Sequence, residues 1–465
     1  MVSNLKNMTD LTVNEIIEAT GGELLAGDPG PFTGVSIDSR AIAEGGLFFA
    51  LRGERFDGHA FIEKALVKGA GAVVDSRPSV LPQGRVIILV KDTLKALQDL
   101  AHFLRTRRDI PVVAVTGSNG KTTTKEMVYS VLSKRYRTLK NEGNLNNHIG
   151  LPLSLTRLSA EDEAAVLEMG MNAPGEIRRL REIAAPTHGV ITNIGSAHLG
   201  MLGSREAIRD AKLEILPGLS VAIINADDEM LVRGVEKAED FKGEIISFSI
   251  NNDSNVMAKD IQSTERGSSF ILKFRDIGEI PVSLGVHGIF NVYNALAAAA
   301  AAFSLGLPVD VIKAGLEDFS AFSMRFQIVK TKGLTVINDS YNANPSSMEE
   351  SLKELVRLRT GRAVVVLGDM GELEEFSEEA HKSLGRLISE MGANVFVATG
   401  EMMSLAAEEI KKAGAGKGLE VYAFRDADDV SGNIMDILKE GDTVLIKGSR
   451  SMKMDRVAGR ILNAV

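Results

Sequence analysis

Short, almost wholly apolar runs recur along the chain, and amphipathic stretches of helical length separate them. In the last third of the chain these runs lie at 334–339, 363–369, 394–400, 420–424 and 442–448. Runs that are apolar throughout are typical of strands buried on both faces of a parallel sheet, with helices covering it. The pattern therefore predicts a doubly wound, Rossmann-like α/β domain over 322–465.

The same alternation continues upstream, where it predicts a second, mostly parallel sheet over 91–321. A helical stretch at 93–106 opens this segment, and apolar runs follow at 111–117, 164–170, 188–195 and 220–227. The longest apolar run, ALAAAAAAFSLGL at 295–307, is too short to cross a bilayer, which takes about 20 residues. It predicts a closely packed core helix of small residues, and we expect no membrane span.

The first segment, 1–90, combines short predicted strands with a helix near 59–69, which indicates a small α/β domain. Its strand-like runs lie at 33–40, 46–51 and 85–90. A chain of 465 residues exceeds what one hydrophobic core usually holds. We therefore expect three α/β domains with boundaries at 1–90, 91–321 and 322–465.

Composition and charge narrow the possible functions. The chain is 44% hydrophobic and 25% charged, as in globular proteins, and its first residues have no apolar run like that of a signal peptide. It has no cysteine, which excludes disulfides, thiol nucleophiles and thiolate metal sites and favours Mg²⁺ among the metals. A net charge of −9 argues against nucleic-acid binding. We expect a cytoplasmic protein.

A glycine-rich stretch, VTGSNGKTTT at 115–124, resembles a phosphate-binding loop in a shortened form. The common loop reads G-x-x-x-x-G-K-[ST], and Val115 stands where its first glycine would be. Gly117 and Gly120 would let the backbone approach phosphate oxygens, Lys121 would reach the β and γ phosphates, and Thr122 would face Mg²⁺. The alternative is a glycine-rich turn between a strand and a helix.

Two metal-binding side chains come just past predicted strand ends, on the edge of the sheet that carries the loop. Glu168 closes the apolar run AAVLE, and His198 follows VITNIGSAHLG. A carboxylate and an imidazole at this edge would suit a divalent ion. A helix-capping acid and a loop histidine with ordinary partners are the structural alternatives.

Lys212 occupies an apolar position of a predicted helix. Ile208, Ala211 and Ile215 mark the apolar stripe of GSREAIRDAKLEIL, and Lys212 lies on the same face. A lysine with a buried stem and an exposed ammonium is the usual interpretation. The alternative is an amine made neutral and nucleophilic by burial, which can take up CO₂ as a carbamate and become an anionic metal ligand.

Further polar residues that could contact a nucleotide or a substrate lie near the later apolar runs. Asn291 and Asn294 share a helical face, where they would cap the helix or hydrogen-bond a nucleobase. In VINDSYNANPSS, Asn344 and Pro345 are explained as an N-cap and a first helical residue, whereas Asp339 lacks such an explanation. Asn342 also has no capping role. Arg325, at the domain junction, would place a guanidinium on phosphate or base, and Lys447 and Arg450, past a strand end, would meet a substrate carboxylate.

Taken in order, these motifs resemble those of the Mur ligases of peptidoglycan synthesis. The matching stretches are TGSNGKTTTKE, NLNNHIGLPLSL, LEMGMNAPGEI, ITNIGSAHLG, AKLEIL, HGIFNVYNALAA, DSYNANP and KGSRSM, and the shortened loop is this family's own version. The segments 367–381 and 447–455 are most similar to family members that attach D-alanyl-D-alanine. The D-[ND]-P-R box of the members that attach diaminopimelate is absent.

The resemblance implies a mechanism in which ATP phosphorylates a carboxylate of UDP-N-acetylmuramoyl-tripeptide. The amine of D-alanyl-D-alanine then attacks the acyl phosphate, and phosphate leaves. It implies two Mg²⁺ ions, one held by Thr122 and Glu168 and the other by His198 and a carbamylated Lys212, with Lys121 on the γ-phosphate. ATP would contact Gly117, Ser118, Asn119, Gly120, Lys121, Thr122, Thr123, Asn291, Asn294, Arg325, Asp339 and Asn342.

By the same resemblance, substrate-binding residues are expected in all three domains. They are Ser39, Arg40, Asn146, Asn147, Lys447 and Arg450. Arg325 and Asp339 would act only after domain closure, and a monomer is expected. A sister ligase that adds the third amino acid or adds glutamate to folate is an alternative, although folate ligases lack a domain ahead of the loop. A P-loop ATPase that acts as a switch or motor is another.

Overall fold

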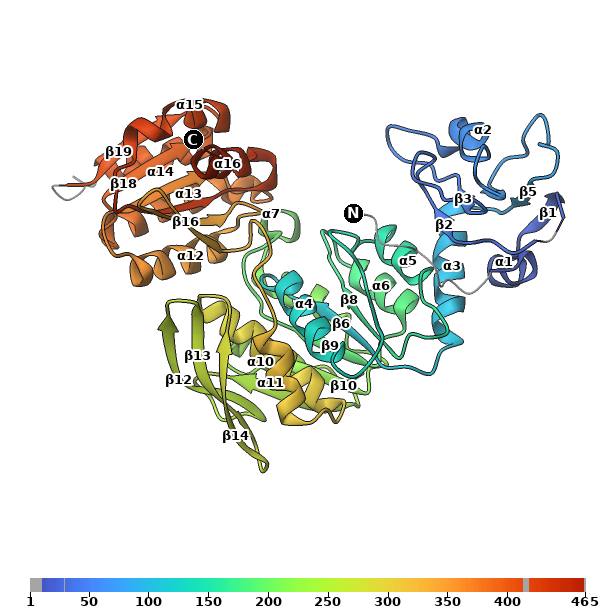
Figure 1. The fold of residues 1–465 in the computed structure, drawn as a ribbon, viewed down its shortest axis with the longest axis horizontal. Helices are drawn as coiled ribbons and strands as arrows, with labels where there is room; N and C mark the ends of the chain where they lie inside the picture. Colours follow the sequence, from blue (N-terminus) through green and yellow to red (C-terminus); the bar gives the residue numbers. More distant parts are fainter. Residues whose placement is uncertain (1–10, 29, 413–417, 464–465) are drawn as a thin grey trace.

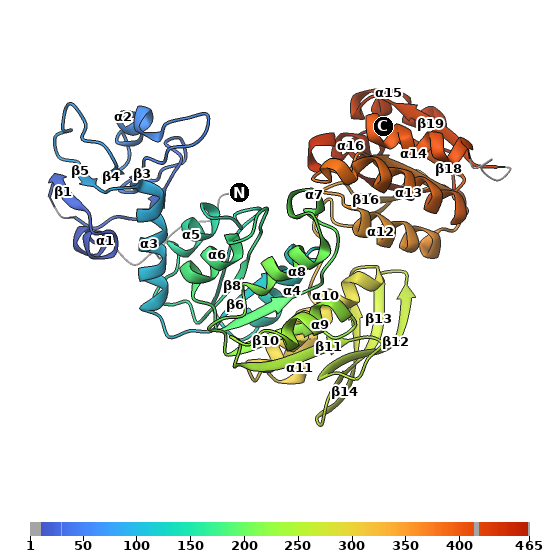
Figure 2. The same ribbon diagram turned by 180° about the vertical axis from the view of Figure 1, so that it is seen from behind.

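The computed structural model describes residues 11–28, 30–412 and 418–463, and this part of the chain folds into three α/β lobes, each with its own sheet (Figures 1 and 2). In both views the N-terminal and C-terminal lobes lie on opposite sides of the middle lobe. The expected fold class is therefore confirmed. The outer limits of the predicted segments, residues 1 and 465, lie outside the described residues, as do the first ten residues of the stretch that lacks a signal-peptide pattern.

The N-terminal lobe contains a small sheet in the order β1-β5-β4-β3-β2, in which β1 is antiparallel to β5 and the other pairs are parallel. Its strands are β1 (Glu23–Ala26), β2 (Val35–Ser36), β3 (Leu47–Phe49), β4 (Gly71–Val74) and β5 (Val86–Leu89), and its helices are α1 (Val13–Thr20), η1 (Gly58–Phe61) and α2 (Ile62–Ala65). The sequence pattern missed β1 and β4, since strands of four residues are too short for a clear period. Helix α3 (Thr93–Thr106) packs on α1 and on helices of the middle lobe and joins the two.

The middle lobe is built on a sheet in the order β14-β13-β12-β11-β10-β9-β6-β8-β7. Its strands are β6 (Val112–Thr116), β7 (Thr138–Lys140), β8 (Ala164–Glu168), β9 (His188–Ile191), β10 (Val221–Asn225), β11 (Glu244–Ser249), β12 (Val256–Thr264), β13 (Gly267–Phe274) and β14 (Gly278–Leu284). Strand β6 lies between β8 and β9 and is parallel to both, so the residues that follow these three strands meet at one edge.

The part from β12 to β14 is antiparallel and was not predicted. Buried and partly exposed residues alternate along β13, a pattern of strands with one face towards solvent rather than of runs buried on both faces. Helices of this lobe are α4 (Lys121–Leu132), α5 (Gly150–Leu155), α6 (Glu176–Ala184), α7 (Leu199–Leu202), α8 (Arg205–Leu213), α9 (Glu229–Glu236), α10 (Ile289–Ser304) and α11 (Val309–Glu317).

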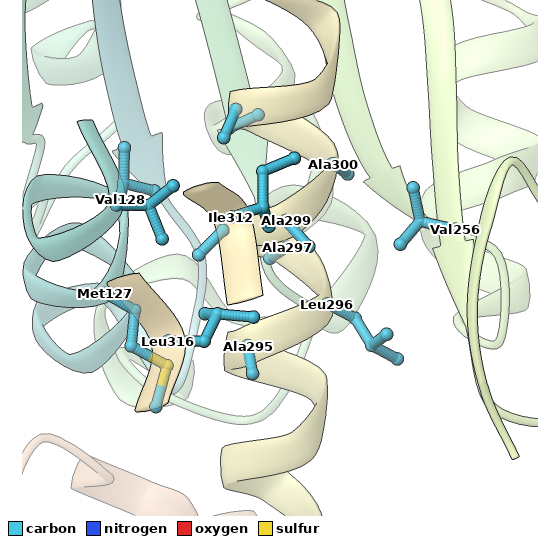
Figure 3. Packing of buried hydrophobic residues seen from close by; sticks show 14 of the residues in the cluster. Met127, Val128, Val256, Ala295, Leu296, Ala297, Ala299, Ala300, Ile312 and Leu316 are labelled. Carbon is cyan, nitrogen blue, oxygen red and sulfur yellow. The ribbon is translucent and has the colours of Figure 1, made fainter. Parts of the chain in front are cut away.

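The alanine-rich run forms α10, and every residue from Ala295 to Ala302 has 0% exposure, so the predicted core helix is confirmed. Figure 3 shows α10 running between Met127 and Val128 of α4 on one side and Val256 of β12 on the other. Short side chains allow α10 to lie close to its neighbours on both sides, in keeping with the density of protein cores.

The C-terminal lobe has a sheet in the order β15-β16-β20-β17-β18-β19, parallel except for the β15–β16 pair. Its strands are β15 (Gln327–Thr331), β16 (Leu334–Asp339), β17 (Ala363–Gly368), β18 (Val395–Thr399), β19 (Glu420–Phe424) and β20 (Thr443–Lys447), and its helices are α12 (Pro345–Leu358), η2 (Glu374–Phe376), α13 (Ser377–Glu390), α14 (Glu401–Lys412), α15 (Ala427–Ile437), η3 (Arg450–Met452) and α16 (Asp455–Asn463). Asn344 caps α12 and Pro345 opens it, as predicted. Throughout the described ranges, no helix combines the length and the apolar character needed to cross a bilayer.

Two glycines within helices should respond in opposite ways when alanine replaces them and adds a Cβ. A Cβ on Gly315 in α11 would lie 2.4 Å from Cα of Val131 in α4, whereas one on Gly432 in α15 would meet nothing within 4 Å. We expect Gly315→Ala to lower the free energy of unfolding by about 1 kcal/mol or more, because overpacking outweighs the gain in helix propensity.

Gly432→Ala is the matched control and should raise stability by about 0.5–1 kcal/mol through helix propensity alone. Calorimetric unfolding of both variants measures the two effects. A Gly315→Ala protein as stable as Gly432→Ala would show that α4 and α11 can separate without cost.

Candidate active site

The glycine-rich loop connects β6 to α4, and its two glycines are required by close approach. Gly117 has φ 146° and Gly120 has φ 80°, values that favour glycine. A Cβ on Gly117 would lie 1.9 Å from Oγ1 of Thr192, and one on Gly120 would lie 2.2 Å from Oδ1 of Asn294. The loop therefore lies directly against Thr192 and Asn294 and leads into the first amides of α4, the end of a helix that binds phosphate.

The loop is held by residues that follow β9. The amide of Asn119 donates to Oδ1 of Asn193 at 2.9 Å, and the Thr192 hydroxyl donates to the carbonyl of Asn119 at 2.6 Å. The Lys121 ammonium folds back on the loop and donates to the carbonyls of Gly117 and Ser118 at 2.8 and 3.2 Å. Burial lowers the pKa of Lys121, and the carboxylate of Glu168 opposes this shift.

The C-terminal lobe contacts this loop directly. The guanidinium of Arg325 stacks on the ring of Tyr341, 3.8 Å from its centroid, and donates to Oγ1 of Thr122 at 3.0 Å. At the start of α12, the side-chain amide of Asn344 donates to Oδ1 of Asn119 at 2.8 Å. Arg325 therefore lies at the junction between lobes, as the sequence predicted, and α12 begins against the loop.

Both lobes line one crevice of about 1080 Å³ around the loop. It brings together most of the predicted site residues. Those in its lining are Ser118, Asn119, Gly120, Lys121, Thr122, Thr123, Asn146, Asn147, Glu168, His198, Asn291, Asn294, Arg325, Asp339, Asn342 and Lys447.

Glu168 ends β8 inside the crevice and has one free carboxylate oxygen. Its Oε1 accepts a hydrogen bond from the amide of Asn146 at 2.7 Å. Its Oε2 is buried and, among the described residues, has no hydrogen-bond partner. Asn141, which the sequence reasoning missed, holds the backbone of Glu168 through bonds to both its N–H and its C=O. An anionic oxygen of this kind suits a cation better than a helix cap.

His198 follows β9 with φ 64° and pairs with a residue that was not predicted. Its Nδ1 lies 2.8 Å from Oε2 of Glu372 in the C-terminal lobe, and this contact lowers the pKa of the Glu372 carboxyl. Glu372 comes shortly after β17, so the rule that ligands lie at strand ends could have pointed to it.

Lys212 of α8 points inward, as its place on the apolar stripe predicted, and is 1% exposed. Within the part of the chain described above, no hydrogen bond or ion pair reaches its ammonium. Burial and then the nearby Lys121 lower the pKa of Lys212 well below its usual value. Lys212 is not in the lining of the crevice, so it lies behind that surface.

The donor set fits a divalent cation only with an added ligand. In the described ranges no three His, Asp or Glu side chains converge on one point where a metal could be held. Glu168 and His198 are present, the hydroxyl of Thr122 faces the crevice, and the unpartnered Oε2 of Glu168 supplies a free negative oxygen. An anionic group on Lys212 would add an oxygen ligand of the kind that divalent cations bind.

Asn294 lies against the loop at Gly120, and Asn291 is hydrogen-bonded to Asn294. Gly288 is the N-cap of α10, without a side-chain bond, so the helix-capping alternative was wrong. The Asn291 amide donates to the carbonyl of His287, and Oδ1 of Asn294 accepts from the hydroxyl of Thr124 in α4. The predicted contact of these two asparagines with adenine stays a prediction.

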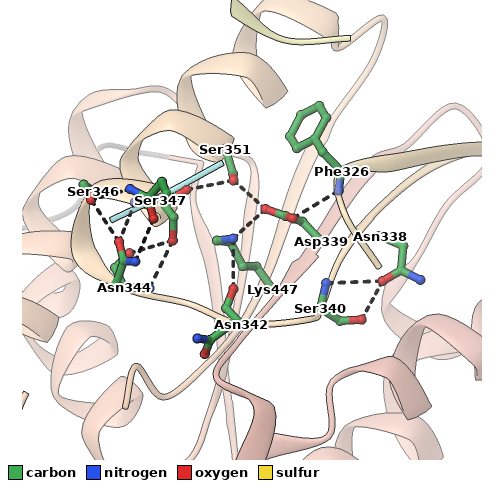
Figure 4. Close-up of polar contacts among 11 residues, drawn as sticks. Phe326, Asn338, Asp339, Ser340, Asn342, Asn344, Ser346, Ser347, Ser351 and Lys447 are labelled. Atoms are coloured by element: carbon green, nitrogen blue, oxygen red, sulfur yellow. Dashed lines mark hydrogen bonds and ion pairs between the residues drawn. The ribbon is translucent and has the colours of Figure 1, made fainter. Parts of the chain in front are cut away.

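Asp339 has structural partners, contrary to the sequence interpretation. Figure 4 shows its carboxylate accepting from the Phe326 amide at 3.1 Å, the Ser351 hydroxyl at 2.7 Å and the Lys447 ammonium at 2.5 Å. Lys447 also donates to the carbonyl of Asn342 at 3.1 Å. Because several unrelated segments meet at this carboxylate, Asp339 organises the crevice wall of the C-terminal lobe.

Three predicted substrate contacts lie away from the crevice. Arg40 is exposed and pairs with Asp38 at 2.7 Å, and its neighbour Ser39 is also absent from the crevice lining. Arg450, also outside the lining, lies 3.7 Å from the sulfur of Met324. Their roles stay predictions, as does that of Asn147, whose Oδ1 accepts from the amides of Ile149 and Gly150 at the start of α5.

Comparison with known proteins accounts for nearly the whole chain. Family models match in three consecutive parts: the Mur ligase family catalytic domain at 31–105, the Mur ligase middle domain at 115–302 and the Mur ligase glutamate ligase domain at 324–450. The UDP-N-acetylmuramoyl-tripeptide–D-alanyl-D-alanine ligase of Bacillus subtilis is 38% identical over 440 residues, which is 93% of each chain.

Two solved structures are also similar. The chain matches a crystal structure of MurF from Acinetobacter baumannii with a TM-score of 0.90 and 32% identity, over 98% of this chain and 99% of that one. It matches the MurF ligase of Thermotoga maritima, solved in complex with ADP, with a TM-score of 0.80 and 30% identity, over 92% of this chain and 96% of that one.

The Asp339–Lys447 pair predicts a stability effect. Lys447 is 3% exposed, so Asp339→Ala leaves a buried ammonium without its carboxylate. We expect a loss of about 3 kcal/mol in the free energy of unfolding of the C-terminal lobe, measured by calorimetry.

The double variant Asp339→Ala, Lys447→Met is the control, because it removes both charges and should recover part of the loss. A single variant with unfolding unchanged within about 0.5 kcal/mol would assign the pair no structural role.

Proposed function

The chain belongs to the Mur ligase family, and from that premise we propose that it joins D-alanyl-D-alanine to UDP-N-acetylmuramoyl-tripeptide, using ATP, in peptidoglycan precursor synthesis. The observation that supports this most is the single crevice in which the phosphate loop and Glu168 of the middle lobe face Arg325 and Lys447 of the C-terminal lobe. A ligase that consumes ATP needs nucleotide, carboxylate and amine in one enclosed space.

The reaction proceeds in two displacements. A free carboxylate of the tripeptide attacks the γ-phosphorus of ATP, which gives an acyl phosphate and ADP. The amine of D-alanyl-D-alanine then attacks the acyl carbon, and the tetrahedral adduct expels phosphate and leaves an amide. Phosphoryl transfer depends mainly on alignment and charge neutralisation, which the loop amides, Lys121 and Arg325 are placed to provide.

Lys121 must leave its present partners to act on ATP. Its ammonium now donates to two carbonyls of its own loop, and the γ-phosphate is a stronger acceptor for a charged donor. Arg325 likewise donates to Thr122, and its guanidinium is suited to a phosphate oxygen at the same place. Nucleotide binding would thus exchange internal hydrogen bonds for bonds to phosphate.

Mg²⁺ is proposed at two positions, with Thr122 and Glu168 at one and His198 and a carbamylated Lys212 at the other. When bound, these ions would neutralise phosphate charge and polarise the acyl oxygen. The buried, unpaired amine of Lys212 supports the carbamate: with its pKa lowered, it is neutral more often, and addition of CO₂ to it releases one proton. The free Oε2 of Glu168 supports the other position.

The expected substrate contacts, location and oligomeric state are part of the same proposal. Ser39 and Arg40 would contact the UDP-sugar, and Asn146, Asn147, Lys447 and Arg450 would contact the peptide parts. Since Ser39, Arg40 and Arg450 lie outside the crevice lining, movement of lobes would have to bring them to the substrate. We place the reaction in the cytoplasm, where ATP is available, and keep a monomer as the expected state.

The substrate requirement of the proposed reaction can be tested by measuring ADP formation. ADP should form at an appreciable rate only when both UDP-N-acetylmuramoyl-tripeptide and D-alanyl-D-alanine are present, because the acyl phosphate needs an acceptor to turn over. Coupled assays of phosphate release, with lysine, diaminopimelate and glutamate as competing acceptors, measure this. Turnover with a single amino acid would favour a sister ligase, and acceptor-independent turnover would favour a simple ATPase.

The proposed carbamate on Lys212 can be tested by substitution of this residue. Lys212→Ala should lose about two to three orders of magnitude in kcat, since a metal-polarised oxygen contributes several kcal/mol to the barrier. Acetate or formate in solution should restore part of the rate by supplying the missing carboxylate. The same change at the exposed Lys237 is the control.

A direct readout accompanies the kinetics. Wild-type protein in ¹³C-bicarbonate should show a ¹³C carbamate signal that Lys212→Ala lacks and Lys237→Ala keeps. Full activity of Lys212→Ala would remove this residue from the mechanism.

A further inference from the structure

A segment of the C-terminal lobe, residues 369–376 between β17 and α13, is anchored in its own lobe. The Met370 amide donates to Nε2 of His381 at 3.0 Å, and His381 is 0% exposed. Oδ1 of Asp369 accepts from the Met403 amide at 2.6 Å. Leu373 is 2% exposed within the lobe's core. The segment therefore presents its remaining side chains from a fixed base.

The same segment meets the middle lobe at α7. The amide of Gly200 donates to the carbonyl of Glu372 at 3.1 Å. A Cβ on Gly200 would lie 2.6 Å from the carbonyl carbon of Leu373, so only glycine permits this approach. Leu199 of α7 packs against the core of the C-terminal lobe. Backbone and apolar contacts thus fix the position of Glu372 relative to α7.

Two residues at this contact have left-handed backbone conformations. His198 has φ 64° and Glu372 has φ 62°, which costs residues other than glycine about 1 kcal/mol or more each. Their side chains meet, with Nδ1 of His198 2.8 Å from Oε2 of Glu372. A costly conformation on both sides of one ion-pair contact indicates a contact that the surrounding structure is built to hold.

The geometry points to Glu372 as a positioning residue for His198, an inference that rests on the proposed function. A carboxylate oxygen 2.8 Å from Nδ1 favours a proton on that nitrogen, so a neutral ring held in this way carries its lone pair on Nε2. Glu372 therefore selects the tautomer and ring orientation in which His198 can offer Nε2 to a divalent ion. Because Glu372 belongs to the C-terminal lobe, the His198 site is complete only while this lobe is docked on α7.

Binding of Mn²⁺ to the full-length chain in the presence of ADP tests this inference, without UDP-sugar or dipeptide. His198→Ala defines the binding event that depends on the imidazole. We expect Glu372→Ala to weaken that event about 10- to 100-fold, as for other groups that orient a ligating histidine, and Glu372→Gln to weaken it less, because an amide oxygen still accepts from Nδ1. Glu375→Ala, an exposed change on the same segment, should leave affinity unchanged.

Nitrogen-15 spectra of labelled histidine, recorded on the same proteins without metal, give a second readout. The ring of His198 should be protonated at Nδ1 in the wild type and in Glu372→Gln, and should become a tautomer mixture in Glu372→Ala. Thermal unfolding of each variant verifies that the fold is kept.

Wild-type Mn²⁺ affinity in Glu372→Ala, or an unchanged titration in His198→Ala, would overturn the inference. A weaker affinity with an unchanged tautomer would also overturn it, since Glu372 would then act by charge alone. If the Glu372 effect is found but the wild type makes no amide, the proposed function fails and the positioning role stands.

Discussion

The close approach of backbone to side chain at the phosphate loop is the constraint on which the site depends. Gly117 lies against Thr192 and Gly120 against Asn294, so the loop is seated on β9 and α10 with no room for a Cβ. That seating determines where the amides at the start of α4 point and where Lys121 and Thr122 begin. The C-terminal lobe then has a fixed surface to meet.

Charge is the second constraint, because some charged side chains in the crevice or just behind it lack an ion-pair partner within the described part of the chain. Lys121 donates to carbonyls of its own loop, Lys212 has a lowered pKa, and Glu168 keeps one unpartnered oxygen among the described residues. An arrangement of this kind is poorly satisfied by the protein alone and is suited to anionic substrates and cations. By contrast, the Asp339–Lys447 pair is fully engaged within its lobe.

The sequence predicted the features that depend on local pattern. Most strands of the parallel sheets, the helix of small residues, the inward Lys212 and the Asn344 cap follow from apolar runs, side-chain size and capping chemistry. The parallel strands β4, β7 and β11 were missed, because β4 is short and β7 and β11 are partly exposed. Contacts between residues far apart in the chain are not encoded in local pattern, so the partners of Asp339 within its lobe and the pairing of Glu372 with His198 across lobes were missed. The antiparallel strands β12 to β14 were missed because one of their faces is exposed and their pattern alternates.

Helix α10 acts as a spacer of fixed thickness beneath the nucleotide site. Its buried alanines leave no side-chain rotamers through which a change of volume could be absorbed, so a strain on the β12 side is passed on as a rigid displacement. The helix carries Asn294 at the end that supports Gly120. The position of Asn294 against Gly120 is therefore tied to the packing of α10 on β12, in a remote part of the sheet that also carries the loop.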